Sequence, residues 1–506
     1  MDSNDVSILI GRLEREADDN PQLHLGKVGL VAALGFLPLL ILLIGALTGL
    51  ISLIYSLVTV GRGPLVPVLL LGVCAAGIVA VVRALLVPGL VPGGREVTYE
   101  DAPALFDAID DVVERMSYTR KNETCAAWIE SVTLDGSFEA KLHQVPRWGV
   151  FGGFQNHLQI GIPLLAALSI AELKALLAHE IGHLGGEHDR VAAWLYRQRV
   201  AWGLVQQKFA KPTNAIDRVL GKFFGWYAAY FQAYAFVLAR NLEYKADRAA
   251  ARATHPGAVA NALTKIALMR RFLEEEFWPR FMSQVETAPE PPYPPYSMMP
   301  RAFGLALKQW SRQDWLDRSL RTLPVAGDTH PSLGERFEAL NILPAPPTYA
   351  ADRSSLSLFG QDGPKMLKWC DDMWRKENGA FWRQRHKAIS EVRWKIAEYE
   401  RTAPADMSPE DLWQKVLLVL EVGEHARAIE ELQYLIARDP KMAKAQLLLG
   451  KLLLQFGDEQ GLQYLQAAAE HDTQMVEDAG GAGYTYLMDR GRKGEAQRFW
   501  DRVCAA

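Results

Sequence analysis

Two long apolar runs near the beginning of the chain differ from the amphipathic patterns that follow them. No charged residue occurs in residues 28–61 or in residues 63–82. Each run is long enough for a helix that crosses a hydrocarbon core of about 30 Å, which takes roughly 20 residues. The pattern predicts a transmembrane helical hairpin over residues 28–94, with its turn at residues 61–64, after a polar segment of residues 1–27.

Basic residues predict how this hairpin is oriented. They flank its two outer ends, whereas the loop between the runs holds a single one (Arg12, Arg15, Lys27, Arg83 and Arg95 outside, Arg62 in the loop). Because loops on the cytoplasmic side carry an excess of Lys and Arg, both outer ends are predicted to be cytoplasmic. The alternative is a single span followed by a re-entrant or interfacial segment, since Arg83, Pro88 and Pro92 weaken the second run.

From residue 95 the pattern becomes that of a soluble α+β domain. Residues 102–116 have apolar positions at helical spacing, and residues 128–134 and 151–160 are typical of strands, the second interrupted by two glycines. Ser169, followed three positions later by Glu172, predicts a capping box and the start of another helix. The sequence therefore predicts helices around a small sheet.

Two later stretches have an unusual composition. Residues 223–239 are uncharged and rich in aromatics, but the stretch is short and contains Gln232, so a buried helix is favoured over a third membrane segment. Residues 287–300 contain six prolines and are predicted to be neither helix nor central strand. A loop at the rim of a cleft or a plain extended spacer would both fit this second stretch.

The C-terminal part is predicted to be helical and repetitive. Residues 346–405 are charged, rich in tryptophan and typical of a helical connector. In residues 406–506, Gly423, Gly457 and Gly491 are 34 residues apart, and each precedes a helical stretch. This period resembles that of tetratricopeptide repeats, which stack helix pairs into an α-solenoid. The whole chain is therefore predicted to be mainly α.

Charge and cysteine content narrow the classes of function. The 506 residues have a formal net charge of −4 and no sustained basic stripe, so no nucleic-acid partner is expected. The four cysteines are far apart and include no CxxC pair, so they provide neither a disulfide framework nor a thiolate zinc site.

The strongest chemical signal is an HExxH sequence within a stretch that has the apolar rhythm of a buried helix. His179 and His183 are four residues apart, so they project from one face of that helix and can bind one zinc ion. Glu180 then lies beside the water molecule that completes the zinc shell. The competing interpretation is a chance match on a helix that bears histidines.

Two histidines leave a catalytic zinc one protein ligand short, because such sites have three protein ligands and one open position. The third ligand has to be another histidine or a carboxylate on a neighbouring element. Glu243 is our candidate, with Asp247 on the same helix face as an outer partner that orients a ligating histidine. Taken without the HExxH sequence, the two carboxylates are more typical of a surface charge pair on an amphipathic helix.

Four separated blocks occur in a characteristic order: residues 158–173, the HExxH block 178–183, RNLEYKAD at 240–247 and HPSLGER at 330–336. Together they resemble the zinc metallopeptidases of the HtpX, CAAX-prenyl-protease, Oma and BepA types. The resemblance covers roughly residues 97–345. The chain departs from the family pattern at Ser332, where a second proline is common, and in having no clear later pair of membrane spans.

This resemblance implies a zincin-like metallopeptidase domain over residues 95–345 that holds one zinc ion per chain. It also implies roles for individual residues: zinc ligands (His179, His183, Glu243), general base (Glu180), outer partner (Asp247), and supporting catalytic groups that orient the substrate or stabilise the oxyanion (His330, Arg336).

The predicted function is zinc-dependent hydrolysis of peptide bonds by an integral membrane protein, in membrane or envelope protein quality control. The substrate is expected to be an unfolded or membrane polypeptide that adds as an extended strand beside residues 151–160, taken as the edge strand of the sheet. The expected location is the bacterial inner membrane, with the catalytic domain in the cytoplasm. The repeats would bind a protein partner.

Two other functions compete with this one. The first is a membrane-anchored scaffold or chaperone, with a structural zinc site and the repeats as its working part. Glu180 argues against it, because a structural site has no need of a carboxylate next to the water. The second is a CAAX-type protease that acts on prenylated tails, which would need an intramembrane chamber that one hairpin does not supply.

Overall fold

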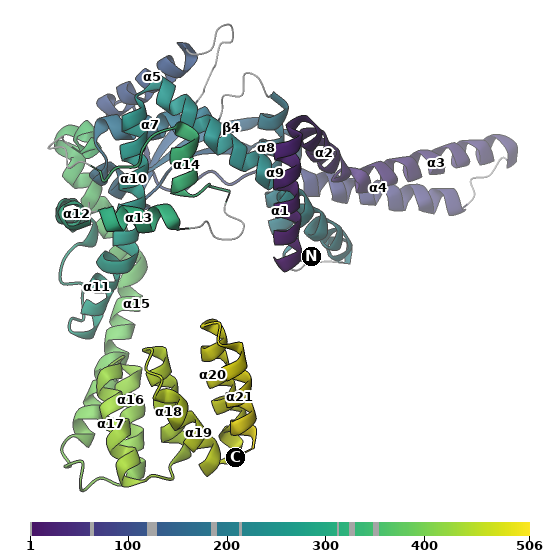
Figure 1. The fold of residues 1–506 in the computed structure, drawn as a ribbon. Coiled ribbons are helices and arrows are strands. Elements are labelled where there is room, and N and C mark those ends of the chain that lie inside the picture. Colours follow the sequence, from purple (N-terminus) through teal and green to yellow (C-terminus); the bar gives the residue numbers. More distant parts are fainter. Residues whose placement is uncertain are drawn as a thin grey trace. The chain divides into compact units, whose positions relative to one another are not determined.

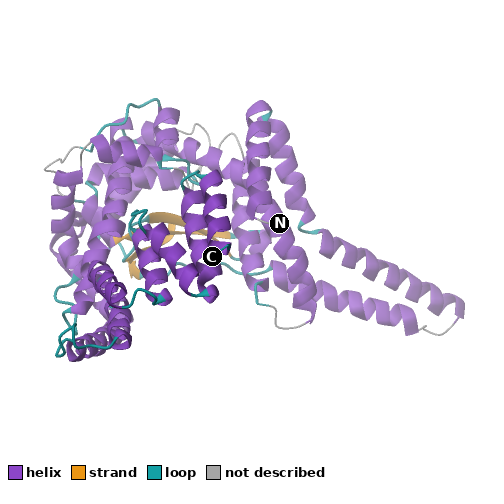
Figure 2. Ribbon diagram, turned by 60° about the horizontal axis from the view of Figure 1, so that its bottom comes forward, coloured by secondary structure: helices purple, strands orange, loops and turns teal. Residues whose placement is uncertain are grey.

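The computed structural model describes residues 3–60, 65–118, 129–183, 190–211, 215–310, 313–322, 329–347 and 354–505. In this part the chain is mainly helical with one small sheet, which confirms the predicted fold class (Figures 1 and 2). The predicted turn at residues 61–64 lies outside the described residues. The chain divides into two compact units: Met1–Phe281 with Tyr293–Arg375, and Met282–Pro292 with Lys376–Ala506. The domain boundaries expected from the sequence stay predictions.

Four helices precede the sheet: α1 (Ser3–Asp19), α2 (Pro21–Leu34), α3 (Leu37–Val60) and α4 (Leu65–Leu85). α3 and α4 lie side by side and are long and apolar enough to cross a membrane (Figure 1). The first uncharged run is divided between α2 and α3, and Val28 and Val31 of α2 are buried in the core of the first unit. The chain turns at Gly35, where a Cβ atom would lie 2.3 Å from the ring of Trp202.

The sheet contains β1 (Arg95–Val97), β2 (Ile129–Asp135), β3 (Ala140–Pro146) and β4 (Phe154–Gly161), in the order β1-β2-β4-β3. β2 and β4 are parallel, and the other two pairs are antiparallel. The prediction that residues 151–160 form the edge strand is therefore wrong. β4 lies inside the sheet, and the edge beside it is β3, which the sequence did not reveal.

The strand β4 also begins later than predicted. Gly149–Phe151 form a short 3-10 turn, and Gly152 and Gly153 have positive φ angles of 105° and 69°. Such angles are open to glycine and interrupt a strand. As a result Trp148 and Phe151 belong to a turn between β3 and β4, not to either strand.

One apolar core lies between this sheet and its neighbouring helices. These helices are α5 (Pro103–Tyr118), α6 (Ile162–Ala167), α7 (Ile170–Gly182) and α10 (Pro256–Phe272). Fully buried aliphatic side chains from strands and helices fill the core (Leu105, Val112, Leu134, Leu158, Ile160, Leu173, Leu177, Leu268). The capping box predicted at the start of α7 is confirmed, with Ser169 and Glu172 exchanging their two hydrogen bonds.

A second core of the same unit forms around α9 (Ala215–Ala253), which packs against α1, α2 and α8 (Arg190–Phe209). Residues 223–239 lie within α9, and Phe224, Tyr227 and Phe231 are fully buried. This agrees with the buried helix expected from the sequence. This packing holds the part of α9 that directly precedes Glu243 and Asp247.

The proline-rich stretch contradicts the expectation that residues 287–300 contain no helix. α12 (Pro295–Trp310) begins within it and contains Pro300. Pro295 is tolerated at the start of α12, because the N–H groups of the first turn have no helical acceptor, whereas Pro300 lies further inside the helix. The carboxylate of Asp371 accepts hydrogen bonds from the N–H groups of Tyr296 (2.7 Å) and Ser297 (3.1 Å), which fixes the start of α12.

The remaining elements before the last helices are short, apart from α15, and Met282–Pro292 and the residues from Lys376 onward belong to the second unit. They are a π-helical turn η2 (Leu273–Phe277), α11 (Trp278–Ser283), the 3-10 turn η3 (Gln284–Glu286), α13 (Gln313–Arg321), α14 (Leu333–Leu340), the 3-10 segment η4 (Ser355–Asp362) and the long α15 (Gly363–Tyr399). α14 packs on α9 and brings the late His-Pro block to it.

From Pro409 on, the second unit consists of three successive helix pairs. They are α16 (Pro409–Glu421) with α17 (His425–Arg438), α18 (Ala443–Gln455) with α19 (Gly461–His471), and α20 (Val476–Asp489) with α21 (Lys493–Cys504), with a 3-10 turn η5 (Thr473–Met475) before the last. Gly423, Gly457 and Gly491 join the members of each pair, with φ angles of 80°, 82° and 75°. The 34-residue spacing therefore marks equivalent turns, while the assignment to tetratricopeptide repeats stays a prediction.

Candidate metal centre

The C-terminal end of α7 meets α9 at very short range, because Gly182 faces Ala246 across the two helices. A Cβ atom on Gly182 would lie 3.2 Å from the Cα and 3.3 Å from the Cβ of Ala246. A side chain at this position would push the backbones apart. The close approach lets Glu243 on α9 reach the two histidines of α7.

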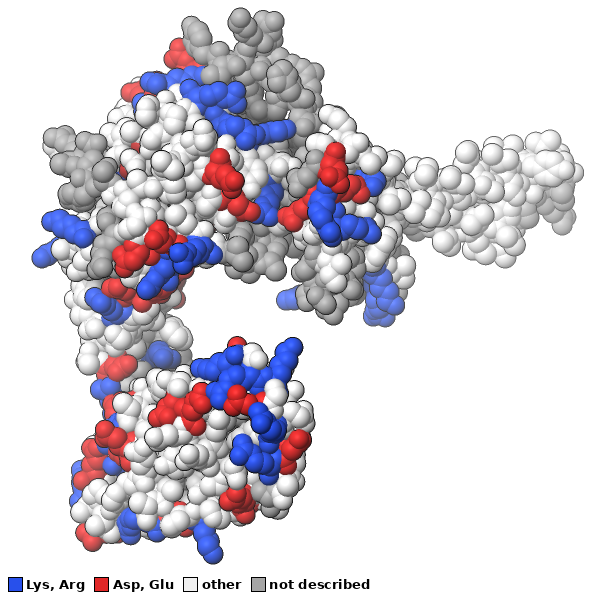
Figure 3. All heavy atoms as spheres, viewed as in Figure 1, with Lys and Arg blue, Asp and Glu red and all other residues white. Residues whose placement is uncertain are grey.

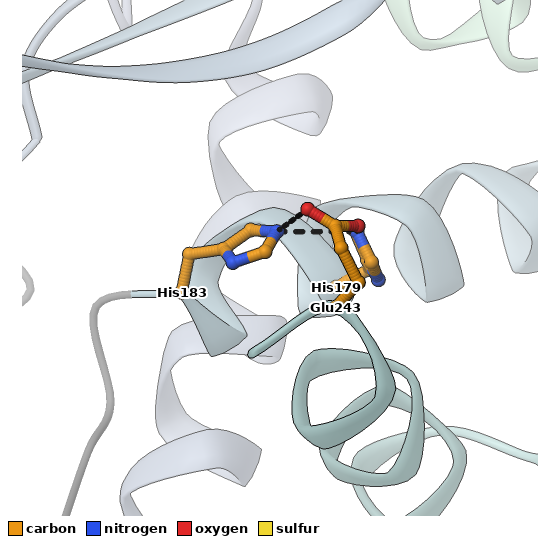
Figure 4. A group of neighbouring side chains, drawn as sticks. All are labelled: His179, His183 and Glu243. Atoms are coloured by element: carbon orange, nitrogen blue, oxygen red, sulfur yellow. Dashed lines mark hydrogen bonds and ion pairs between the residues drawn. The ribbon is translucent and has the colours of Figure 1, made fainter. Parts of the chain in front are cut away.

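Three side chains converge at this point: His179, His183 and Glu243 (Figure 4). The Nε2 atoms of the two histidines are 3.3 Å apart. Oε2 of Glu243 lies 3.4 Å from Nε2 of His179, and Oε1 of the same carboxylate lies 3.5 Å from Nε2 of His183. Two of the three side chains, those of His179 and Glu243, are buried.

These separations fit a zinc ion. With zinc–nitrogen and zinc–oxygen distances near 2.1 Å, the edge of a ligand tetrahedron is about 3.4 Å. Two imidazole nitrogens and one carboxylate are a donor set that zinc accepts in catalytic sites, with the fourth position left for water. The residues that the sequence singled out as ligands are therefore brought together in a geometry suited to that metal.

A second layer of contacts orients His179. Its Nδ1 lies 2.8 Å from Oδ1 of Asp247, whose side chain is fully buried. Arg336 on α14 donates two hydrogen bonds to the same carboxylate, from Nε (2.7 Å) and from Nη2 (2.5 Å). When Nδ1 of a histidine donates to a carboxylate, Nε2 is left as the ligand atom, so Asp247 fixes the tautomer that a metal needs.

Electrostatics keeps the two carboxylates ionised. Burial alone would raise the pKa of Glu243, but the neighbouring histidines outweigh it and lower the pKa to about 2. Burial opposes ionisation of Asp247 as well, and the hydrogen bonds and charge of Arg336 hold its pKa well below the usual value. Burial would lower the pKa of His179, yet its contacts with Asp247 and Glu243 raise it to about 9. Both acidic groups are thus carboxylates at neutral pH, the form that binds metals or orients their ligands.

Glu180, next to His179 on α7, also contacts the sheet. Its Oε2 accepts a hydrogen bond of 3.0 Å from the backbone N–H of Leu142 in the edge strand β3. Because this N–H is used by Glu180, it is directed away from β4 and toward the open side of the edge. The contact places a carboxylate between the helix of the two histidines and the outer edge of the sheet.

The late His-Pro block contributes its two predicted residues in different ways. Nε2 of His330 lies 3.9 Å from Glu243, and the side chain is 61% exposed. Arg336 is largely buried and engaged by Asp247. Ser332, where the chain departs from the family pattern, caps α14 and forms a capping box with Glu335. That box holds the helix that carries Arg336.

Sequence reasoning missed three groups around this centre: Leu142, Arg240 and Glu335. Arg240 pairs with Glu335 of α14 (2.5 Å) and with Glu14 of α1 (2.9 Å), one turn of α9 before Glu243. The S-x-x-E pattern of Ser332 and Glu335 was readable as a capping box. The hydrogen bond from Leu142 comes from the backbone and leaves no signal in the sequence.

Comparison with known protein families finds a match for part of the chain. Residues 151–343 match the family model described as peptidase family M48. No curated protein and no solved structure matches the chain significantly. The matched residues include all seven side chains that the sequence analysis proposed for the site, and they exclude the edge strand β3 and everything before it.

Proposed function

Because residues 151–343 belong to peptidase family M48, we propose that this chain is a membrane-anchored zinc endopeptidase. The observation that carries the proposal is the convergence of His179, His183 and Glu243, whose ligand atoms all lie within 4.8 Å of one another. These three residues would hold one zinc ion. Bound there, the ion supplies a Lewis acid for the scissile carbonyl and lowers the pKa of a water molecule.

Glu180 is the general base of the proposed reaction. Its carboxylate takes a proton from the attacking water and passes it to the amine that leaves. The N–H of Leu142 holds one carboxylate oxygen, which leaves the other free to receive the proton. Glu180 is thereby oriented before a substrate arrives.

Asp247 and Arg336 are positioning residues in this proposal. Asp247 fixes the ring of His179, and Arg336 fixes Asp247 and balances its charge. We reassign Arg336 to this role, since its guanidinium is committed to Asp247 and is not free for an oxyanion. The exposed His330, at the rim of the ligand cluster, is the better candidate for contact with the substrate.

β3 is the strand that would receive the substrate. It is the edge next to Glu180, and an extended peptide can add to a free edge through backbone hydrogen bonds. This mode of binding favours unfolded or flexible segments over folded domains. It supports a role in quality control of membrane or envelope proteins. We further propose that the catalytic domain lies on the cytoplasmic side and that the C-terminal helix pairs bind a protein partner.

The decisive test is digestion of casein by the purified full-length protein in detergent. We expect cleavage that a chelator abolishes and that added zinc restores. Glu180→Gln should lower the rate by about two to four orders of magnitude, the usual contribution of a general base. Metal analysis should find one zinc per chain in both proteins. Glu391→Gln, an exposed carboxylate on α15, is the matched control and should leave the rate unchanged.

Undiminished cleavage by Glu180→Gln would refute the assigned base. One bound zinc with no cleavage of casein or of any membrane protein tested would instead favour the scaffold with a structural metal site.

A further inference from the structure

We propose that the turn between β3 and β4 is a second membrane contact, in which Trp148 and Phe151 enter the interfacial layer of the lipid beside the hairpin. This inference rests on the proposed anchoring by α3 and α4 and extends it to the catalytic unit. Most of the turn precedes residues 151–343, so the match to the family does not supply it.

The turn is packed on the end of α4, where the hairpin returns to the sheet. Gly149 lies so close to this end that a Cβ atom would overlap the carbonyl oxygen of Leu85. Val150 and Leu85 are both buried in the same apolar core. After α4, the N–H of Gly89 donates to the carbonyl of Pro146, the last residue of β3 (3.0 Å). The turn is therefore held at the base of the hairpin.

The side chains on either side of these buried residues face outward. Trp148 is 64% exposed and Phe151 is 48% exposed. The uncharged segment of residues 86–94 adds exposed apolar side chains next to them (Leu86, Leu90, Val91). α3 and α4 are themselves exposed over most of their length, and the visible face of the hairpin carries no charged side chain (Figure 3). Exposed apolar surface thus continues from the hairpin to the turn.

Basic groups accompany this surface, as expected at a boundary with anionic lipid. Arg83 lies in the last turn of α4, and Arg147 precedes Trp148, with both side chains exposed. The amine of Lys208 donates to the carbonyl of Arg83 (2.9 Å), so a third positive charge lies beside the end of α4. Tryptophan prefers the headgroup region of a bilayer, and Lys and Arg next to it favour anionic headgroups. A lipid surface matches this combination better than a protein partner does.

This contact determines which substrates reach the site. Leu142, whose N–H holds Glu180, is six residues before Trp148 along the chain. Six extended residues span at most about 20 Å. With Trp148 at the lipid surface, the reactive carboxylate lies within that distance of the membrane. The preferred substrates are then flexible segments of membrane proteins that directly adjoin a span.

The test uses spin labels on single cysteines in the full-length protein, with its four native cysteines replaced by alanine. The protein is placed in nanodiscs of phosphatidylcholine and phosphatidylglycerol. Labels at Trp148→Cys and Phe151→Cys should be accessible to oxygen and shielded from a water-soluble nickel reagent. The ratio of the two accessibilities should exceed that of Trp394→Cys, an equally exposed control in the second unit, by several-fold.

A label at Ile54→Cys, exposed in the second half of α3, separates the two possible failures. If Ile54 also reports water, the anchoring by the hairpin fails. If Ile54 reports lipid while positions 148 and 151 match position 394, the second contact is wrong and the anchoring stands.

Cleavage sites provide a second measurement. Fragments of a single-span protein in the same nanodiscs should start or end within about six residues of its span, read by mass spectrometry. Cuts spread evenly along a longer soluble segment would contradict the inference, even if the peptidase activity itself is confirmed.

Discussion

Ion pairs connect α7 to neighbouring helices near its beginning, middle and end. The pairs differ in how deeply they are buried and in which groups lie next to them. At the beginning, Lys265 of α10 reaches Glu172 (2.6 Å), and both side chains are buried. At the end, Arg336 meets Asp247, which holds His179. In the middle, Lys174 contacts Asp111 of α5 (2.6 Å) at about 30% exposure of each side chain.

The two buried pairs have similar chemistry but different neighbours. Glu172 lies among apolar core residues and also completes the capping box of Ser169, so its charge serves the helix itself. Asp247 lies beside the candidate zinc ligands, so its charge serves the geometry of the site. The comparison teaches that burial alone does not mark a functional charge. A functional charge is identified by the group to which its carboxylate is hydrogen-bonded: a helix cap for Glu172, and the candidate ligand His179 for Asp247.

Breaking the first pair should have the largest effect, and the effect should be on stability. Lys265→Met leaves the carboxylate of Glu172 buried without its partner, which costs about 3–5 kcal/mol of unfolding free energy. Chemical denaturation followed by circular dichroism measures it. Zinc content per folded chain should not change.

The matched control for this variant is Lys365→Met, which breaks the exposed pair with Asp362. It should cost no more than about 1 kcal/mol. Equal losses of unfolding free energy in the two variants would show that burial of the Lys265–Glu172 pair does not increase the cost of breaking it.

Breaking the second pair from the acidic side should have the next largest effect, and it should be on metal binding. Asp247→Asn keeps the shape of the side chain but removes its charge and weakens its grip on Nδ1 of His179. Loss of such an outer partner typically costs about 10-fold to 100-fold in metal affinity or activity. Competition with a chromophoric chelator gives the zinc affinity. An unchanged affinity would mean that His179 is oriented without Asp247.

Altering the same pair from the basic side should have a smaller effect. Arg336→Lys keeps the positive charge but can no longer make two parallel hydrogen bonds to Asp247. We expect a loss of zinc affinity of at most about 10-fold, below that of Asp247→Asn. Steady-state kinetics should show a lower kcat with little change in KM, because this residue does not touch the substrate. A rise in KM alone would instead point to substrate contact.

The half-buried pair of Lys174 and Asp111 should have the smallest effect, and this effect should depend on pH. The side chains of Lys174 and Arg115 hold the pKa of Asp111 below its usual value. A lowered carboxylate pKa contributes stability that is present above the unfolded pKa of about 3.9 and is lost as the pH falls through the folded value. Lys174→Met should therefore cost at most about 1 kcal/mol at pH 7 and less at pH 3. A larger cost at pH 3 would reverse the expected sign.

The sequence predicted those features that repeat or obey a local rule. The uncharged runs, the capping box at Ser169, the 34-residue spacing of three glycines and the face shared by His179 and His183 all follow from spacing along the chain. Each could be read without knowing which elements touch.

The features that were missed depend on contacts between distant elements. β3 reads AKLHQVP, with Lys141 and His143 on a polar face, so its apolar alternation is too weak to identify a strand. α12 begins among prolines because Asp371, on another helix, supplies its cap. β3 and α12 could therefore not be predicted from their own residues, because each depends on a contact with an element that is distant in the sequence.

Gly182 has a consequence for the choice of ion. Its missing methyl group sets the gap between α7 and α9, and that gap sets how far Glu243 stands from the two imidazoles. In a tetrahedron, a longer edge means a proportionally longer bond to the centre. In the proposed zinc centre, Gly182→Ala would spread the helices by a few tenths of an ångström and shift the preference of the centre toward cations of larger radius. The absence of one methyl group would thus limit the size of the ion that the proposed centre accepts.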